Sequence, residues 1–177
     1  MNSLRVLWLF LKVGIMNEAQ YRANFFAQVL QSIISLVTGL VVLGLVFTYT
    51  ESLNSWTRPE LLIVMGVHIL MGGLIQMLIQ PNMVRLMREI EQGTLDYMLT
   101  KPEDAQVLAS VRELRFWQVV DVFSGAAVIV WGIAELSAGV SFFQILAFLF
   151  MLVMGFLIFY SFWLLVASSA FKFIRIG

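Results

Sequence analysis

The stretch from Phe25 to Tyr49, FFAQVLQSIISLVTGLVVLGLVFTY, decides the fold class, because it contains no charged side chain. As a helix rising about 1.5 Å per residue it would be about 37 Å long. That length exceeds the roughly 30 Å hydrocarbon core of a bilayer. The stretch therefore predicts a transmembrane helix.

The composition of the whole chain agrees with a membrane protein. Of its 177 residues 60% are hydrophobic and 12% are charged, and the mean hydropathy is +0.91. A soluble domain of this composition could not cover its own surface. No polar block is long enough for a separate domain, so we expect one transmembrane domain over residues 1–177. The eleven basic and eleven acidic residues balance, which gives no indication of a nucleic-acid partner.

Three further stretches are long and apolar enough to span the bilayer as helices: 60–80, 117–136 and 142–170. Residues 3–16 are apolar but carry Arg5 and Lys12, and they are too short to span. This segment predicts an interfacial helix, which either anchors the N-terminus or takes part in gating. The expected fold is an all-α membrane protein with four transmembrane helices, this interfacial helix and short cytoplasmic coupling helices within a loop over residues 81–116.

The basic residues predict the orientation in the cell (inner or plasma) membrane. Ten of the eleven Lys and Arg residues fall before the first span, between the second and third, or after the fourth, and Arg58 alone falls elsewhere. Cytoplasmic loops carry an excess of Lys and Arg. Both termini and the 81–116 loop are therefore expected on the cytoplasmic side of a multi-pass protein.

The 81–116 loop has more local structure than a simple connection needs. Pro81 should end or kink the second span, but apolar residues at helical spacing predict that a helix continues beyond it. Gly93 suits a left-handed helix end, and Pro102 suits the first turn of another helix. Between these two residues a short turn has an apolar face formed by Leu95, Met98 and Leu99. Such a face favours docking onto another protein, or alternatively folding back onto the bilayer surface.

A dozen residues of this loop carry a resemblance to a known family. The pattern E-x-G-T-L-D-x-x-L-x-K-P resembles the cytoplasmic segment of ABC-2-type transporter permeases, the membrane subunits of bacterial ABC exporters. It is formed by Glu91, Gly93, Thr94, Leu95, Asp96, Leu99, Lys101 and Pro102. In those permeases the pattern follows the second transmembrane helix, and an interfacial N-terminal helix precedes both, as in this sequence. Members of the branch of ABC-2 permeases that this sequence most resembles usually have six spans, so the resemblance implies that the last two are lacking here.

The resemblance implies a permease subunit that couples ATP binding and hydrolysis by a separate ATP-binding subunit to substrate export. The coupling element would be Thr94, Leu95, Asp96 and Tyr97, flanked by Met98 and bounded by Gly93 and Pro102. ATP and Mg²⁺ would bind to the partner ATPase, and this chain would need no cofactor. A second permease copy or a homologue would complete the transporter in the lipid bilayer.

The residues themselves give no catalytic or metal-binding set. One histidine and no cysteine leave no zinc cluster, and the carboxylates form no pair for acid–base catalysis. The chain is therefore not expected to be an enzyme. His68, Gln76 and Asp121 are the polar residues within spans that could line a path or join helices.

Two further readings of the sequence stay open. Ser35 and Gly39 are spaced for close packing of the first span against a neighbour. The chain as a whole could also be a non-transporting four-helix scaffold or assembly protein that recruits a different soluble partner through the 81–116 loop.

Overall fold

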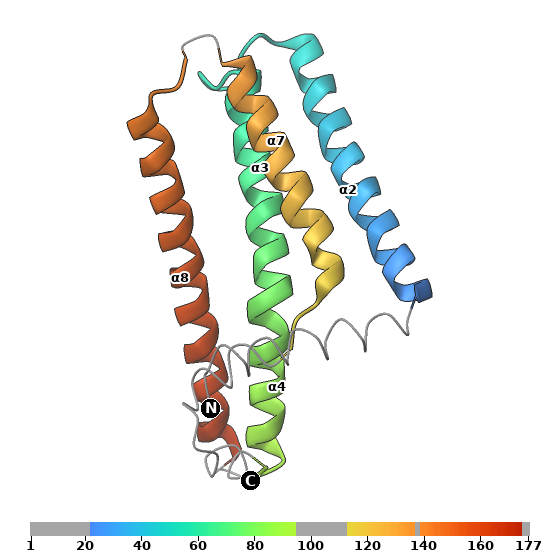
Figure 1. Cartoon of the computed structure of the whole chain (residues 1–177), viewed down its shortest axis with the longest axis vertical. Coiled ribbons are helices and arrows are strands. Elements are labelled where there is room, and N and C mark those ends of the chain that lie inside the picture. The colour runs from blue at the N-terminus through green and yellow to red at the C-terminus, as the bar shows by residue number, and fades with distance from the viewer. Residues whose placement is uncertain (1–21, 95–112, 137–138, 175–177) are drawn as a thin grey trace. The chain divides into compact units, whose positions relative to one another are not determined.

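The computed structural model describes residues 22–94, 113–136 and 139–174. In these ranges it is all-α, as expected, and Figure 1 shows the helices as long rods. The elements are α2 (Arg22–Tyr49), α3 (Arg58–Leu74), the π-helix η1 (Ile75–Ile79), α4 (Gln80–Glu91), the 3₁₀ turn η2 (Phe116–Gln118), α7 (Val119–Glu135) and α8 (Phe142–Ile174). The expected interfacial helix 3–16 lies outside the described residues.

Four helical stretches are long and apolar enough to cross a membrane: Phe25–Tyr49, Arg58–Glu91, Phe116–Glu135 and Phe142–Ala170. The prediction of four spans is thus confirmed, and so is the prediction that a helix continues beyond Pro81. The helix continues from α3 through η1 into α4 without a break in the helical assignment. A π-turn widens the helix by one residue, and this widening directly precedes Pro81, where a proline would otherwise crowd the preceding turn.

Contacts between Cα atoms divide the chain into two compact units, which are described separately. The glycine-packed unit comprises residues 23–74 and 117–154. The α4 unit comprises residues 1–22, 75–116 and 155–177.

Glycines hold α3 and α7 together in the glycine-packed unit, where the two helices lie side by side (Figure 1). A β-carbon built on Gly125 would lie 2.5 Å from the backbone nitrogen of Leu70. One built on Gly66 would lie 2.8 Å from the backbone nitrogen of Ile129. Both distances are shorter than any side chain tolerates, so the two backbones meet only because both residues are glycine.

A second pair of glycines extends this contact along both helices. Gly73 follows Gly66 by seven residues, and Gly132 follows Gly125 by seven. A β-carbon on Gly73 would lie 3.0 Å from the Val122 nitrogen, and one on Gly132 would lie 3.0 Å from the Pro59 carbonyl oxygen. The contacts run in opposite directions along the two helices, so α3 and α7 are antiparallel. Seven residues are about two helical turns, which keeps each pair on one face.

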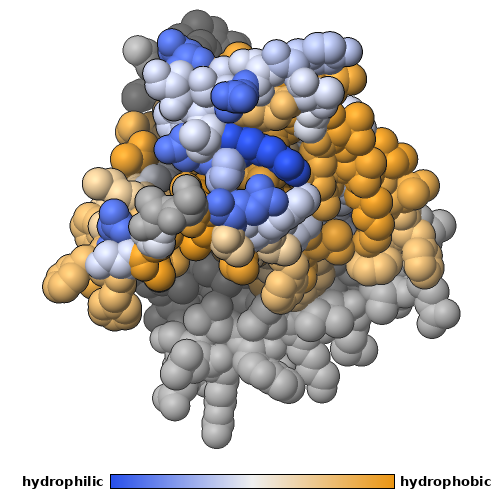
Figure 2. Space-filling model, turned by 90° about the horizontal axis from the view of Figure 1, so that it is seen from above, coloured by the Kyte–Doolittle hydropathy of each residue, from blue (hydrophilic) through white to orange (hydrophobic). Residues whose placement is uncertain are grey.

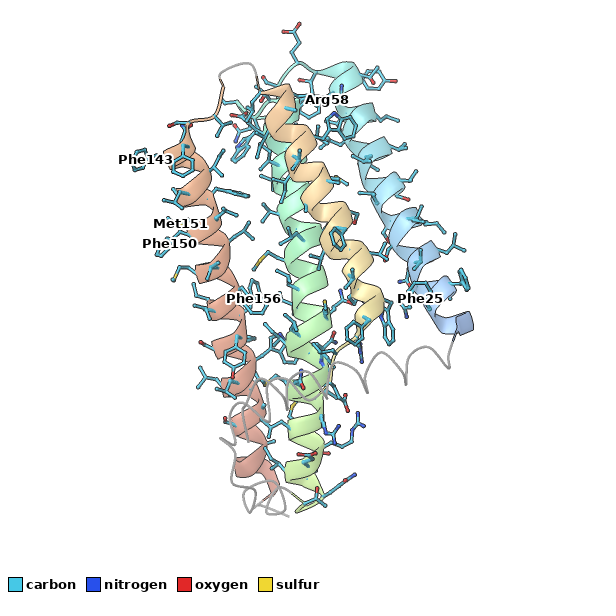
Figure 3. The ribbon with its side chains drawn as sticks, in the orientation of Figure 1. Phe25, Arg58, Phe143, Phe150, Met151 and Phe156 are labelled. Carbon is cyan, nitrogen blue, oxygen red and sulfur yellow. The ribbon has the colours of Figure 1, made fainter. Side chains whose placement is uncertain are left out.

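The other helical parts of this unit are much more exposed. On α2, the β-carbon position of Gly39 is 2.6 Å from the terminal methyl of Met65, a flexible side chain, while Ser35 is exposed. Of the expected small-residue pair, therefore, only Gly39 meets a neighbour. On α8, Phe143, Phe150 and Met151 project away from the helix (Figure 3) and are more than half exposed. Such surfaces suit contact with lipid.

A tight turn joins α2 to α3. Asn54 and Ser55 both have positive φ, of 50° and 71°, as the two central residues of a type I′ turn require. Leu53 and Trp56 exchange two backbone hydrogen bonds across it, of 2.9 and 3.0 Å. The next helix begins with a capping box, because the Glu60 carboxylate accepts hydrogen bonds from the N–H and the hydroxyl of Thr57. Figure 2 shows hydrophilic residues gathered at this end of the molecule, bordered by hydrophobic ones.

Candidate functional site

The α4 unit holds the residues on either side of the predicted coupling segment. Pro81 stands in the first turn of α4 and is buried. Because proline has no N–H, it cannot donate to the Met77 carbonyl four residues earlier. The backbone N–H of Arg115 donates to that carbonyl instead, at 3.2 Å. The proline thus opens a hydrogen-bonding position on the helix that a returning segment of the chain uses.

Asn82 fixes the same returning segment with its side chain, which has no exposed surface. Its amide nitrogen donates to the carbonyl oxygens of Leu78 and Glu113, both at 2.7 Å. Its amide oxygen accepts the backbone N–H of Glu113 at 2.8 Å. The side chain therefore pairs with both backbone groups of Glu113, as a neighbouring β-strand would. We call this arrangement of Pro81, Asn82 and residues 113–115 the α4 anchor.

Charged groups reinforce the α4 anchor at its edge. Arg85 binds the Glu113 carboxylate through Nη1 at 2.8 Å and the Glu89 carboxylate through Nε at 2.9 Å. The Glu113 side chain is about half exposed, at 47%. Exposed ion pairs contribute about 0–1 kcal/mol, so the buried amide of Asn82 carries more of the anchor's stability than the ion pairs do.

The far end of α4 is closed by glycine. Gly93 has φ of +65°, in the left-handed conformation expected from the sequence. The Gly93 N–H donates to Ile90 at 3.2 Å and the Thr94 N–H donates to Glu89 at 3.0 Å. These two bonds form a Schellman motif, which satisfies the last carbonyls of the helix. Both ends of the stretch 95–112 are therefore attached to α4, one through Thr94 and the other through Glu113.

A neighbouring face of the same helix packs against the last part of α8, which lies beside it (Figure 1). Ile79, Met83 and Ala167 are at most 1% exposed and form the centre of an apolar cluster. Side chains around them come from both helical regions: Ile75, Leu86, Met87, Phe156, Tyr160, Trp163 and Leu164. The contact between α4 and this part of α8 is therefore made by interlocking side chains, as in the packing of helices within membranes.

The predicted coupling residues are described only in part. Glu91, Gly93 and Thr94 are exposed on the end of α4. The remaining predicted residues lie outside the described residues, namely Leu95, Asp96, Tyr97, Met98, Leu99, Lys101 and Pro102.

The three polar residues predicted within spans differ in their exposure. His68 and Gln76 are exposed along the second span. Asp121 is half-buried, with its β-carbon 3.0 Å from the β-carbon position of Gly73. It therefore stands at the contact between α3 and α7. Among the described residues no group of three His, Cys, Asp or Glu side chains could hold a metal ion.

Two features of this arrangement were missed by sequence reasoning. One is Asn82, whose position directly after Pro81 is the only local signal, since its partner Glu113 follows 31 residues later. The other is the seven-residue glycine spacing on α3 and α7, which a search for four-residue spacing does not detect.

Four apolar spans, with a helix that extends past a proline to hold both ends of a polar connection, define a multi-pass α-helical membrane protein. A family model described as ABC-2 family transporter protein matches residues 7–177, so the chain belongs to this family. The chain is accordingly a membrane subunit with a permease role in an ABC transporter, a family that works with ABC ATPases. No curated protein and no solved structure matches the chain.

Proposed function

We propose that this permease converts ATP binding and hydrolysis on a separate ABC ATPase into substrate export, with a second permease copy or homologue completing the pore. The observation that carries the proposal is the attachment of both ends of the stretch 95–112 to α4, through Thr94 and Glu113. A soluble partner that binds this stretch would therefore act on α4, to which both of its ends are attached.

The proposed coupling element is Thr94, Leu95, Asp96 and Tyr97, bounded by Gly93 and Pro102. Closure of the nucleotide-binding subunits on ATP would push on this element. The Schellman motif at Gly93 gives the element a fixed departure from α4. A helix is stiff along its axis, so a push at the end of α4 would reach its contact with α8.

The docking proposal predicts that Leu95→Asp combined with Leu99→Asp abolishes co-purification of the ATPase. Two aspartates on an apolar face leave unpaired charges in the contact, and the loss of hot-spot residues costs about 2 kcal/mol or more each. The measurement is the amount of ATPase retained on the affinity-tagged permease, and membrane insertion should be unchanged.

A matched control for that variant is Leu53→Asp, at a leucine that is 50% exposed in the turn between α2 and α3. The control should retain the ATPase fully. Retention of the ATPase by the double variant would show that the docking surface lies elsewhere.

The proposed orientation places the α4 end in the cytoplasm and the turn between α2 and α3 outside. The chain has no cysteine, so single introduced thiols report their side unambiguously. A membrane-impermeant maleimide should label Ser52→Cys in intact cells and should label Glu91→Cys only after permeabilisation. Both positions are exposed. The reverse pattern would contradict the orientation and with it the docking of a cytoplasmic ATPase.

A further inference from the structure

We propose that Asn82 is a positioning residue for energy coupling. By holding residues 113–115 on α4, it makes them move together with α4 and the adjoining part of α8, as one lever. The inference rests on the proposed function, because the lever is useful only if an ATPase acts on the stretch between Thr94 and Glu113. It goes further by naming the side chain that transmits the motion and the helix that receives it.

The first step is the way in which Asn82 holds the chain. Among the described residues, its hydrogen-bond partners outside its own helix are backbone atoms of Glu113. Together with the bond from the Arg115 N–H to the Met77 carbonyl, they fix Glu113 and Arg115, the residues on either side of Leu114, to α4 and η1. Without these bonds the exit of the coupling segment would be tied to α4 mainly by the exposed Arg85 ion pair, which screening by water weakens.

The second step is the chemistry of the amide. The Leu78 and Glu113 carbonyls both need a donor, and the Glu113 N–H needs an acceptor. Among side chains of this length only asparagine supplies two N–H donors and one oxygen acceptor at once. Leucine has nearly the same shape but supplies neither, and aspartate keeps only the acceptor while it is ionised.

The third step is the direction in which the motion leaves α4. Met83 follows Asn82 directly and Ile79 stands three residues before it, and both are buried against Ala167 of α8. One turn of helix thus carries the anchor on one face and the α8 contact on the next. Displacement of the coupling segment is passed across this turn to α8 with little freedom between, because packed cores deform little.

The test uses the full chain in complex with its ATPase, reconstituted in lipid nanodiscs. An environment-sensitive bimane fluorophore on Ser168→Cys, an exposed position next to Ala167, reports the response of α8 to MgATP and vanadate. Hydrogen exchange of the backbone at residues 113–115 reports the anchor itself. Co-purification reports the ATPase contact.

We expect Asn82→Leu to retain the ATPase, to accelerate exchange at residues 113–115 by about tenfold or more, and to reduce the bimane response to about a fifth or less. Gln80→Leu is the matched control, because it removes an amide two residues away that takes no part in the anchor. It should leave all three readouts at the wild-type level.

Asn82→Asp should make the bimane response depend on pH, which a purely structural role of Asn82 would not do. An ionised carboxylate would face the Leu78 and Glu113 carbonyl oxygens without a donor, whereas a protonated one donates to one of them. The bimane response of this variant should therefore be weak at high pH, where the carboxyl group is ionised, and recover as the pH falls, while the wild-type response changes less over the same range. It also serves as the informative variant if Asn82→Leu does not fold.

An undiminished bimane response in Asn82→Leu, with exchange at residues 113–115 accelerated, would overturn the positioning role and leave the proposed function standing. Unchanged exchange would also overturn the role, because the side chain would then not hold the segment. Failure of the wild-type chain to retain any ABC ATPase would instead remove the proposed function, and co-purification alone shows it.

Discussion

Replacing Gly125 with leucine is expected to separate α3 from α7 and to leave little folded protein in the membrane. The β-carbon position of Gly125 is 2.5 Å from the Leu70 nitrogen and 2.8 Å from the Gly66 carbonyl oxygen. Both neighbours are backbone atoms, which cannot rotate away as a side chain can. Overpacking that forces backbone shifts costs about 1–3 kcal/mol for small additions, and a leucine adds four carbons. We expect the variant to lose at least about 3 kcal/mol, measured by thermal unfolding in detergent and by the yield of monodisperse protein.

The control for this prediction lies on the opposite helix. The β-carbon position of Gly72 has nothing within 4 Å, although Gly73 beside it is packed against Val122. Gly72→Leu should therefore unfold at the wild-type temperature or above it, since leucine favours helix over glycine by about 1 kcal/mol.

Gly125→Ala gives a graded form of the same test, because alanine adds only the β-carbon whose position is already too close. It should fall between the wild type and Gly125→Leu. Equal stability of Gly125→Leu and Gly72→Leu would mean that the two helices do not meet through Gly125.

The membrane spans could be predicted from the sequence because lipid imposes one rule on every residue of a span. The stretch 25–49 contains no charged side chain, and the helical span found there has the same ends. The apolar part of the second span was predicted to end near Gln80 with a helix continuing beyond it, and the helix is found to run to Glu91. Charged residues after Pro81 lower the hydropathy without breaking the helix, so hydropathy locates the lipid boundary and not the end of the helix.

The packing between spans could not be predicted in the same way. Gly66 and Gly125 are far apart in the sequence, and neither the order of the spans nor their hydropathy shows that α3 pairs with α7. The pair Ser35 and Gly39 had the expected spacing for close packing, yet Ser35 is exposed and Gly39 meets only the end of the Met65 side chain. Small residues permit a close approach, but the identity of the neighbour depends on the whole fold.

Only part of the α4 anchor could be predicted from the sequence, for a related reason. Local rules predicted the helix beyond Pro81 and the left-handed Gly93, because each depends on a few consecutive residues. The bonds between Asn82 and Glu113 depend on a return of the chain 31 residues later. An isolated asparagine after a proline is equally typical of an exposed turn, so its burial could be learned only from the structure.

Replacing Ala167 with phenylalanine should disrupt the contact through which α4 is proposed to move α8. Ala167 has no exposed surface and lies against Ile79 and Met83, so there is no room for an aromatic ring between α8 and the second span. We expect a loss of about 1–3 kcal/mol in stability, and a larger effect on coupling. Hydrogen exchange at residues 113–115 should remain slow because the Asn82 bonds are untouched, while the bimane response on α8 should be lost.

The same substitution at Ala147, which is exposed on α8, is the matched control and should change neither stability nor the response. Loss of the response in Ala167→Phe, with both the anchor and the ATPase contact intact, would locate the transmission step at the contact between α8 and the second span. If Ala167→Phe gives the same bimane response as Ala147→Phe, motion reaches the membrane by another route. Coupling would then persist although the α8 contact is disrupted. Asn82→Leu and Ala167→Phe interrupt the proposed path at successive points. A path through both contacts predicts that each variant loses the bimane response on α8. It also predicts that only Asn82→Leu accelerates hydrogen exchange at residues 113–115.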